Sequence, residues 1–188
     1  IERIMAKLSS KKASSSDLLN IANTIIPLSG IKDKISKIPT KILPQITDQE
    51  FNLLDGISKK LILALNSEIG ASLEKGNLIN QGFNKKRDEL FFIEETSKLK
   101  LEKIEKKYKS LTGISKLRIK SNNIFGYFIE IPKTQASKIP DSFERRQTLV
   151  NCERFTTTEL IKFESEILSA KENLSKLERK IYQELIEE

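Results

Sequence analysis

The sequence of 188 residues contains no histidine and only one cysteine, Cys152. Without histidine it lacks the side chain that most often shuttles protons near neutral pH and binds transition metals. A single cysteine cannot form an internal disulfide, and it makes a thiolate metal site implausible. These absences argue against a metal centre and against the usual forms of acid–base catalysis within this chain.

Long apolar runs are also missing. No stretch approaches the roughly 20 apolar residues of a membrane-spanning helix, and the N-terminus lacks the charged-then-apolar pattern of a signal peptide. The seven glycines and five prolines, with 38% hydrophobic and 31% charged residues, fit ordinary globular usage. We therefore expect an ordered cytoplasmic protein with no membrane partner. Because the chain begins with Ile1 and enters a helical pattern midway, we interpret it as an internal fragment.

The net charge of +7 is unevenly distributed along the chain. Residues 113–157 contain eight Lys and Arg but four Asp and Glu, whereas residues 158–188 contain five Lys and Arg but eight Asp and Glu. A basic middle followed by an acidic end favours contact between the middle and a polyanion.

Apolar residues at helical spacing predict three amphipathic helices in the first third of the chain: 1–8, about 17 towards Pro27, and about 48–68. The second is expected to start at Ser16 or Asp17, either of which can cap a helix. Pro39 and Pro44 predict a short helix followed by a loop.

Two longer helices are predicted at about 84–112 and 156–188, each with apolar residues repeating every three or four positions. We expect them to pack antiparallel. The expected fold is mainly α with a small β insertion: a helical core and lever (1–112), a β segment (113–155) at the tip of the helix pair, and a returning lever helix (156–188).

The β segment contains strand candidates at 116–121 and 126–132, joined by Asn122 and Asn123, which tolerate positive φ and suit a tight turn. After a proline-containing loop, residues 145–153 alternate like a third strand. The resulting sheet of three or four strands is expected to have one apolar face: Leu117, Ile119, Phe125, Tyr127, Ile129, Ile131 and Leu149.

The opposite face of the sheet is expected to be basic and polar. Its members are Arg118, Lys120, Arg146, Thr148 and Arg154, with Asn122, Asn123 and Asn151 near strand ends. Side chains of these types contact phosphate oxygens without reading bases. This face therefore predicts binding to duplex DNA that is independent of sequence and sensitive to salt. The alternative is that the three arginines of this region form ordinary surface ion pairs: Arg145, Arg146 and Arg154 with Glu130, Glu144 and Glu153.

Catalytic motifs are not found. There is no glycine-rich phosphate loop followed by Lys and Ser or Thr, and no Ser or Cys stands beside a base in a recognisable setting. We therefore expect no enzyme active site within these residues.

Several longer segments of the sequence resemble the lever and clamp region of the bacterial MutS family of DNA mismatch-repair proteins. They are "IERIMAKL", "GFNKKRDEL", "LTGISKLRIKSNNIFGYFIEIPK" and "RRQTLVNCERFTTTELIKFESEILSAKE". The resemblance implies a helical core and lever interrupted by an antiparallel β clamp that closes around duplex DNA, in a dimer whose clamps cross. In that family other domains read the mismatch and hydrolyse ATP.

From this resemblance we expect this chain to hold DNA non-specifically and to transmit motion, with no cofactor of its own. ATP and Mg²⁺ would bind elsewhere in the parent protein. The expected partners are double-stranded DNA, a second subunit and mismatch-repair proteins, in the cytoplasm with the nucleoid. The family's DNA-backbone contacts carry over to these positions: Asn122, Asn123, Thr148 and Asn151, with basic Lys120, Arg145 and Arg146 nearby.

Two alternatives remain open. The chain could be a structural helical arm that spaces protein partners, which predicts no salt-sensitive DNA binding. It could also belong to a MutS homologue that acts outside mismatch repair.

Overall fold

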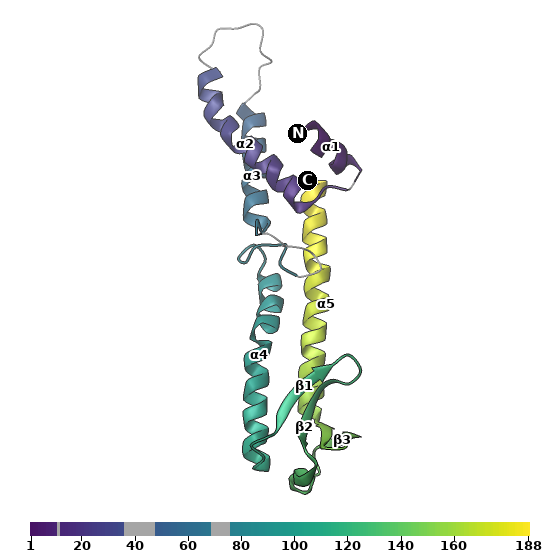
Figure 1. Ribbon diagram of the computed structural model, residues 1–188. Coiled ribbons are helices and arrows are strands. Elements are labelled where there is room, and N and C mark those ends of the chain that lie inside the picture. The colour runs from purple at the N-terminus through teal and green to yellow at the C-terminus, as the bar shows by residue number, and fades with distance from the viewer. Residues whose placement is uncertain (11, 36–47, 69–75) are drawn as a thin grey trace. The chain divides into compact units, whose positions relative to one another are not determined.

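The computed structural model describes residues 1–10, 12–35, 48–68 and 76–188. The protein is mainly helical with one small antiparallel sheet, as the sequence predicts (Figure 1). It divides into two compact units: unit 1 comprises Ile1–Asp88 and Leu174–Glu188, and unit 2 comprises Glu89–Asn173. The expected division at residues 112 and 156 stays a prediction. In the described part of the chain, no helix combines the length and apolar character needed to cross a membrane.

The described residues of unit 1 form three helices and the ends of two more: α1 (Glu2–Ser9), α2 (Ser15–Ile35), α3 (Asp48–Ala64), the start of α4 (Lys85–Thr112) and the end of α5 (Thr158–Glu187). The expectation that α2 ends towards Pro27 is wrong, because the helix continues to Ile35. A proline ring removes one hydrogen bond and bends a helix, but does not always end it. The predicted helix and loop around Pro39 and Pro44 lie outside the described residues.

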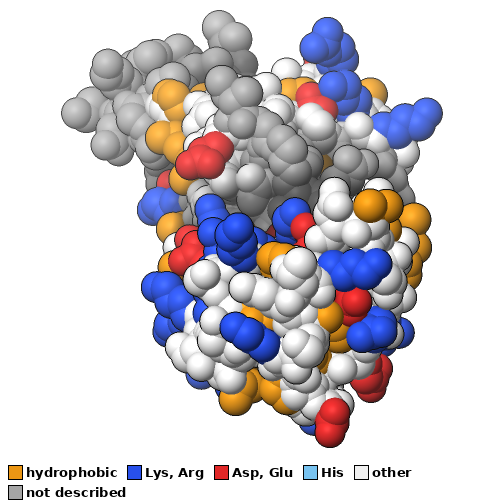
Figure 2. Space-filling model, turned by 60° about the horizontal axis from the view of Figure 1, so that its bottom comes forward, with side chains coloured by type: hydrophobic (Ala, Val, Ile, Leu, Met, Phe, Trp, Pro, Cys, Tyr) orange, Lys and Arg blue, Asp and Glu red, His pale blue; other side chains and the backbone are white. Residues whose placement is uncertain are grey.

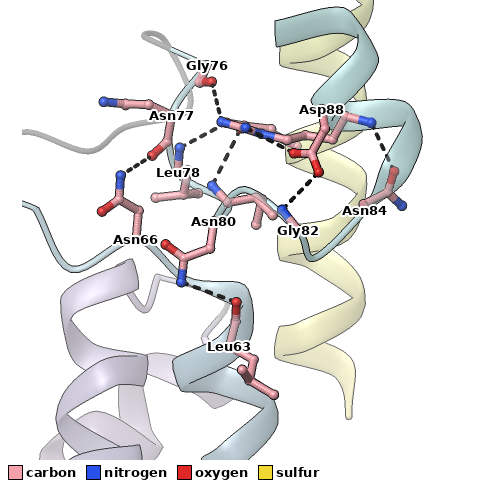
Figure 3. Close-up of polar contacts among 12 residues, drawn as sticks. Leu63, Asn66, Gly76, Asn77, Leu78, Asn80, Gly82, Asn84 and Asp88 are labelled. Atoms are coloured by element: carbon pink, nitrogen blue, oxygen red, sulfur yellow. Dashed lines mark hydrogen bonds and ion pairs between the residues drawn. The ribbon is translucent and has the colours of Figure 1, made fainter. Parts of the chain in front are cut away.

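The core of unit 1 combines residues from both ends of the chain: Leu18, Ala22, Leu61, Ala64, Leu65, Leu78, Ile79, Ile181 and Leu185. The extended segment before α4 crosses this core, where Ile79 forms an antiparallel bridge with Leu65. The side-chain amide of Asn80 donates to the carbonyls of Ile62, Leu63 and Leu65 at 2.9–3.1 Å. Figure 3 shows the bond to Leu63. These bonds satisfy carbonyls that the end of α3 would otherwise leave unpaired.

A buried ion pair joins three segments of unit 1. Arg87 on α4 is 3% exposed and Glu178 on α5 is fully buried, with Nε and Oε1 2.9 Å apart. The backbone N–H of Leu78 donates to the other carboxylate oxygen of Glu178 at 3.0 Å, and Arg87 donates to the carbonyl of Gly76 at 3.2 Å. Figure 3 shows this polar cluster, with Gly76 and Leu78 on the connecting segment and Asp88 on α4. Glu178 thus holds the segment before α4 against α5.

Asp17 stabilises the start of α2. Its carboxylate accepts hydrogen bonds from Lys7 Nζ (2.8 Å), Ser14 N (2.9 Å) and Ser14 Oγ (2.8 Å), and its own N–H donates to Ser14 Oγ (3.2 Å). This reciprocal arrangement resembles a capping box. The hydrogen bond from Lys7, followed by those from Ser14, lowers the pKa of Asp17 from 3.8 to about 2.

We expect Asp17→Asn to destabilise unit 1 at neutral pH, with a loss that disappears in acid. Because the pKa of Asp17 is lower in the folded state, its charged form stabilises the fold above about pH 4. That contribution is lost as pH falls towards about 2. Urea unfolding of both proteins between pH 7 and pH 2 would show the two stability curves converging.

Asp55→Asn is the control for the Asp17 experiment, since Asp55 forms an exposed ion pair with Lys59 one helical turn away. Its effect at pH 7 should be small. A stability difference between wild type and Asp17→Asn that stays constant from pH 7 to pH 2 would contradict the role assigned to this carboxylate.

In unit 2, α4 and α5 lie antiparallel, as expected. Three ion pairs connect them: Glu94–Lys171 (3.1 Å), Lys100–Glu166 (3.3 Å) and Lys107–Glu159 (2.9 Å). Residue numbers rise along α4 as they fall along α5, which fixes the antiparallel direction. These pairs are exposed and contribute little stability individually.

The start of α5 is anchored to the end of α4. Thr157 Oγ1 accepts a hydrogen bond from the N–H of Leu160 (3.1 Å) and lies 2.7 Å from the hydroxyl of Tyr108, which also donates to Glu159 (2.9 Å). Burial of this hydroxyl raises the pKa of Tyr108 to about 12. The capping residue of one helix is therefore held by a buried side chain of the other.

The sheet has four antiparallel strands: β1 (Arg118–Asn122), β2 (Gly126–Pro132), β3 (Glu144–Thr148) and β4 (Cys152–Thr156), in the order β1-β2-β4-β3. A short 3₁₀ helix, η1 (Lys133–Lys138), follows β2. The expected single strand at 145–153 is wrong, since a turn at Leu149 divides it into β3 and β4. The N–H of Leu149 donates to the carbonyl of Cys152 at 2.9 Å. The turn was not predicted because Leu149 and Val150 are apolar residues that are compatible with a strand.

One face of the sheet packs on the two helices and forms the core of unit 2: Tyr108, Ile114, Leu117, Ile129, Ile131, Phe143, Phe155, Leu160, Phe163 and Ile167. Ile119 and Tyr127 pack partly against it, and Leu149 is half-buried. The expectation that Phe125 faces the core is wrong, because it lies in the β1–β2 turn and is 39% exposed. Phe128, which alternation places on the opposite face, is nevertheless buried.

Candidate nucleic-acid interface

The outer face of the sheet, meaning the face turned away from the unit 2 core, carries a chain of charged and polar contacts across all four strands. Lys120 Nζ lies 2.6 Å from Glu130 Oε1, and Arg154 Nε lies 3.2 Å from Glu130 Oε2. Arg154 also donates to the side-chain carbonyl of Gln147 at 2.9 Å. Cross-strand pairing places these side chains together, since Glu130 stands opposite Arg154 and Gln147 stands opposite Arg154 from the other side.

The charges of this outer face compensate one another. The hydrogen bond from Lys120 lowers the pKa of Glu130, and the contact with Arg154 adds to this effect, so the carboxylate is ionised at neutral pH. The Arg154 guanidinium lies 4.4 Å from the centre of the Phe128 ring and covers it. Arg118 is held by Glu105 of α4 at 3.5 Å. The outer face is therefore a paired network rather than a set of free cations.

Arg145 and Arg146, the two adjacent arginines of β3, also have acidic neighbours. Arg145 Nε lies 3.0 Å from Glu153 Oε2, and its guanidinium lies 5.7 Å from the ring centre of Phe155. Arg146 occupies a register shift in the β3–β4 pairing and lies 3.8 Å from Glu144. The ion pairs of the alternative interpretation are thus formed for all three arginines. A phosphate would have to compete with a carboxylate at each one.

The turn between β1 and β2 uses one of the predicted asparagines for its own structure. The side-chain oxygen of Asn122 accepts hydrogen bonds from the N–H groups of Ile124 (3.0 Å) and Phe125 (2.7 Å). Gly126 closes the turn at φ +64°, a conformation that favours glycine. Asn123 is exposed beside it. Asn122 is therefore an Asx-type turn residue, and its side-chain oxygen is already engaged.

The other predicted polar residues, Thr148 and Asn151, flank the turn between β3 and β4 and are exposed. Thr148 stands opposite Glu153, on the face away from Arg154. The expectation that Thr148 shares the face of Lys120 is wrong, because the irregularity at Arg146 changes the alternation.

The two turns lie at opposite ends of β2. Asn122 pairs with Gly126 at the start of this strand, whereas Cys152, next to Asn151, pairs with Pro132 at its end. At about 3.3 Å per residue, the ends of a seven-residue strand are roughly 20 Å apart. The predicted site residues therefore form two groups: Asn122 and Asn123 at one end, and Thr148 and Asn151 at the other.

Sequence reasoning missed η1, which follows β2 beside the second group. Its exposed residues are Lys133, Thr134, Ser137 and Lys138. A signal was present, since Pro132 precedes a short polar segment in which only Ala136 is apolar. Figure 2 shows that some Lys and Arg side chains on the face it draws lie next to Asp or Glu side chains, whereas others are surrounded by uncharged residues.

Metal coordination finds no support in the part of the chain that the structure describes. It contains no group of three or more His, Cys, Asp or Glu side chains that could hold an ion.

Residues 82–173 match the model of MutS family domain IV. The chain is also 37% identical to a protein named DNA mismatch repair protein MutS from Caldicellulosiruptor bescii, over 98% of this chain and 21% of that protein. The chain belongs to the MutS family. Proteins of the same name from Aquifex pyrophilus and Flavobacterium johnsoniae are 37% and 34% identical over 100% and 99% of this chain, and over 22% and 21% of their own lengths.

Domain IV of the MutS family and unit 2 have nearly the same extent. The family model ends at residue 173, as unit 2 does, and it begins at residue 82 where unit 2 begins at Glu89. Every predicted DNA-contacting residue lies within this range. The chain as a whole spans about a fifth of the length of the MutS relatives that it matches.

Proposed function

We propose that unit 2 binds the backbone of duplex DNA without reading its sequence, as part of a protein of DNA mismatch repair. The match of residues 82–173 to MutS family domain IV carries this proposal. The relatives that match 98% and 100% of this chain bear the name DNA mismatch repair protein MutS, which supplies the biological context.

The chemistry of unit 2 supports backbone binding. Residues 113–157 hold eight basic and four acidic side chains, and exposed polar groups lie at both hairpin turns. Lysine, arginine and short polar side chains bind phosphate oxygens and position a protein on DNA, but they carry no base specificity. The seven candidates are Lys120, Asn122, Asn123, Arg145, Arg146, Thr148 and Asn151.

We further propose that α4 and α5 couple DNA binding to the rest of a larger protein. Parts of both helices belong to unit 1 and parts belong to unit 2. The chain covers about a fifth of the length of its relatives and contains no glycine-rich phosphate loop, so in this proposal ATP and Mg²⁺ bind in other segments of the larger protein. A second subunit and mismatch-repair proteins are the other partners in this proposal.

Duplex binding is tested by fluorescence anisotropy with the 188-residue chain and two labelled duplexes that differ by one mismatched base pair. We expect equal affinity for both duplexes. The affinity should fall steeply between about 50 and 200 mM salt, since each neutralised phosphate contributes a slope of about 0.9 to the plot of log affinity against log salt concentration. Tight mismatch-selective binding, or binding that does not respond to salt, would contradict the proposal.

A helical arm that spaces protein partners is the second candidate. The observation that favours it is the pairing of Arg145, Arg146 and Arg154 with carboxylates, which leaves these arginines partly neutralised. The helical-arm hypothesis predicts no duplex binding even at about 50 mM salt, so the same titration distinguishes the two functions.

A further inference from the structure

We propose that η1 and the adjoining β3–β4 turn form the principal phosphate-binding edge of unit 2. We call this surface the η1 edge, defined as Lys133, Thr134, Ser137, Lys138, Thr148 and Asn151. The proposal rests on the proposed duplex binding and goes beyond it, because it assigns the main contacts to lysines outside the paired network of the outer face.

The exposed side of η1 consists of hydrogen-bond donors. Lys133 and Lys138 supply ammonium groups, and Thr134 and Ser137 supply hydroxyls. Ala136 is half-buried and packs against the unit 2 core together with the following Ile139. This anchoring holds the donors outward on a segment that contains no carboxylate.

The positive charge of η1 is not cancelled by a neighbour. Among the residues that the structure describes, neither Lys133 nor Lys138 forms an ion pair, whereas Lys120 lies 2.6 Å from Glu130. Two carboxylates are equally near in sequence: Glu130 is paired with Lys120 and Arg154, and Asp141 is exposed and has no ion pair within the same described ranges. A phosphate can bind these lysines without displacing an internal carboxylate, so the gain in Coulomb energy is not offset by a broken pair.

The β3–β4 turn extends this donor surface. The N–H of Lys133 donates to the carbonyl of Asn151 at 3.2 Å, which ties the start of η1 to the turn. Thr148 and Asn151 are exposed at that turn and add a hydroxyl and an amide. Neutral donors of this kind bind phosphate oxygens beside lysines in protein–DNA complexes.

The spacing of the two lysines suits two phosphates. A 3₁₀ helix rises about 2.0 Å per residue, so the backbone positions of Lys133 and Lys138 are about 10 Å apart along η1. Each DNA strand presents one phosphate per roughly 3.4 Å of helix axis. The two ammonium groups, on flexible side chains, can therefore reach different phosphates of the same strand.

The test compares two double variants of the 188-residue chain that remove the same charge from unit 2. Lys133→Gln with Lys138→Gln should weaken duplex binding about tenfold at about 100 mM salt and lower the salt slope by about 2, since each lysine accounts for about one neutralised phosphate. The control replaces Lys103 and Lys106 with Gln on α4, which are exposed and have no ion pair among the described residues. It should leave the slope nearly unchanged.

Two further variants make the outcome specific. Lys133→Arg with Lys138→Arg keeps both charges and should restore binding, which excludes a folding defect as the cause. Lys120→Gln should change the slope less than Lys133→Gln alone or Lys138→Gln alone, a comparison of one charge with one charge. Equal losses for the η1 and α4 double variants, or a loss for Lys120→Gln larger than that for either single η1 variant, would overturn the η1 edge while duplex binding stands. Failure of the unaltered chain to bind duplex would instead overturn the proposed function and this inference with it.

Discussion

Replacing Glu178 with alanine is expected to lower the free energy of unfolding of unit 1 by about 3–5 kcal/mol. Glu178 is fully buried, and its carboxylate is the partner of Arg87, which is 3% exposed. Removing it leaves a guanidinium in the interior without its main counter-charge. It also leaves the N–H of Leu78 without its acceptor, which adds the desolvation cost of an unpaired donor.

Urea denaturation followed by circular dichroism measures this loss, and hydrogen exchange at the amide of Leu78 reports it locally. The matched control is Glu184→Ala on the same helix, where the carboxylate is exposed and pairs with Lys180 at 3.8 Å. That change should cost between about 0 and 1 kcal/mol. If the two alanine variants proved equally stable, the buried pair would not have the structural role assigned to it.

Truncating Ile129 to alanine is expected to lower the free energy of unfolding of unit 2 by about 2–5 kcal/mol. Ile129 is fully buried in the middle of β2, opposite Ile119 on one side and Phe155 on the other. The missing atoms would leave a cavity at the centre of a sheet of only four strands, where few other contacts can compensate.

Ile124→Ala is the control, because it makes the same chemical change within the same hairpin at a residue that is 83% exposed. Its effect should lie within about 0.5 kcal/mol of zero. Thermal unfolding of the two variants in parallel separates the effect of burial from that of the chemical change alone, since Ile124→Ala makes the same change in the exposed turn. A loss for Ile129→Ala no larger than that for Ile124→Ala would show that the sheet does not depend on this core.

The sequence predicted best where one periodic pattern governs a long segment. The apolar repeats gave the two long helices, and alternation around Asn122 gave the first hairpin, since each pattern reflects one buried face. The β3–β4 turn was missed because Leu149 and Val150 are good strand residues. The continuation of α2 through Pro27 was missed because a proline penalty can be exceeded by packing that local sequence does not reveal.

The candidate site was less predictable than the fold. Lys120, Arg145 and Arg146 could be identified as basic residues of a sheet, but their carboxylate partners depend on strand pairing and on a local register shift. Arg87 and Glu178 are 91 positions apart, so no local pattern connects them. The one available signal was a glutamate within the apolar stripe of the last helix, where a charged residue requires a buried partner.

The interrupted makeup of unit 1 has a consequence for the order in which a ribosome delivers the chain. Unit 2 is one continuous stretch and is fully synthesised at Asn173, whereas unit 1 still requires Leu174–Glu188. Ile181, Leu185 and Glu178, the partner of Arg87, all lie between Leu174 and Glu188. The inserted unit can therefore complete its fold first, and the apolar surfaces of α2 and α3 stay without part of their core until Leu174–Glu188 has been synthesised, against the usual N-terminal-first order.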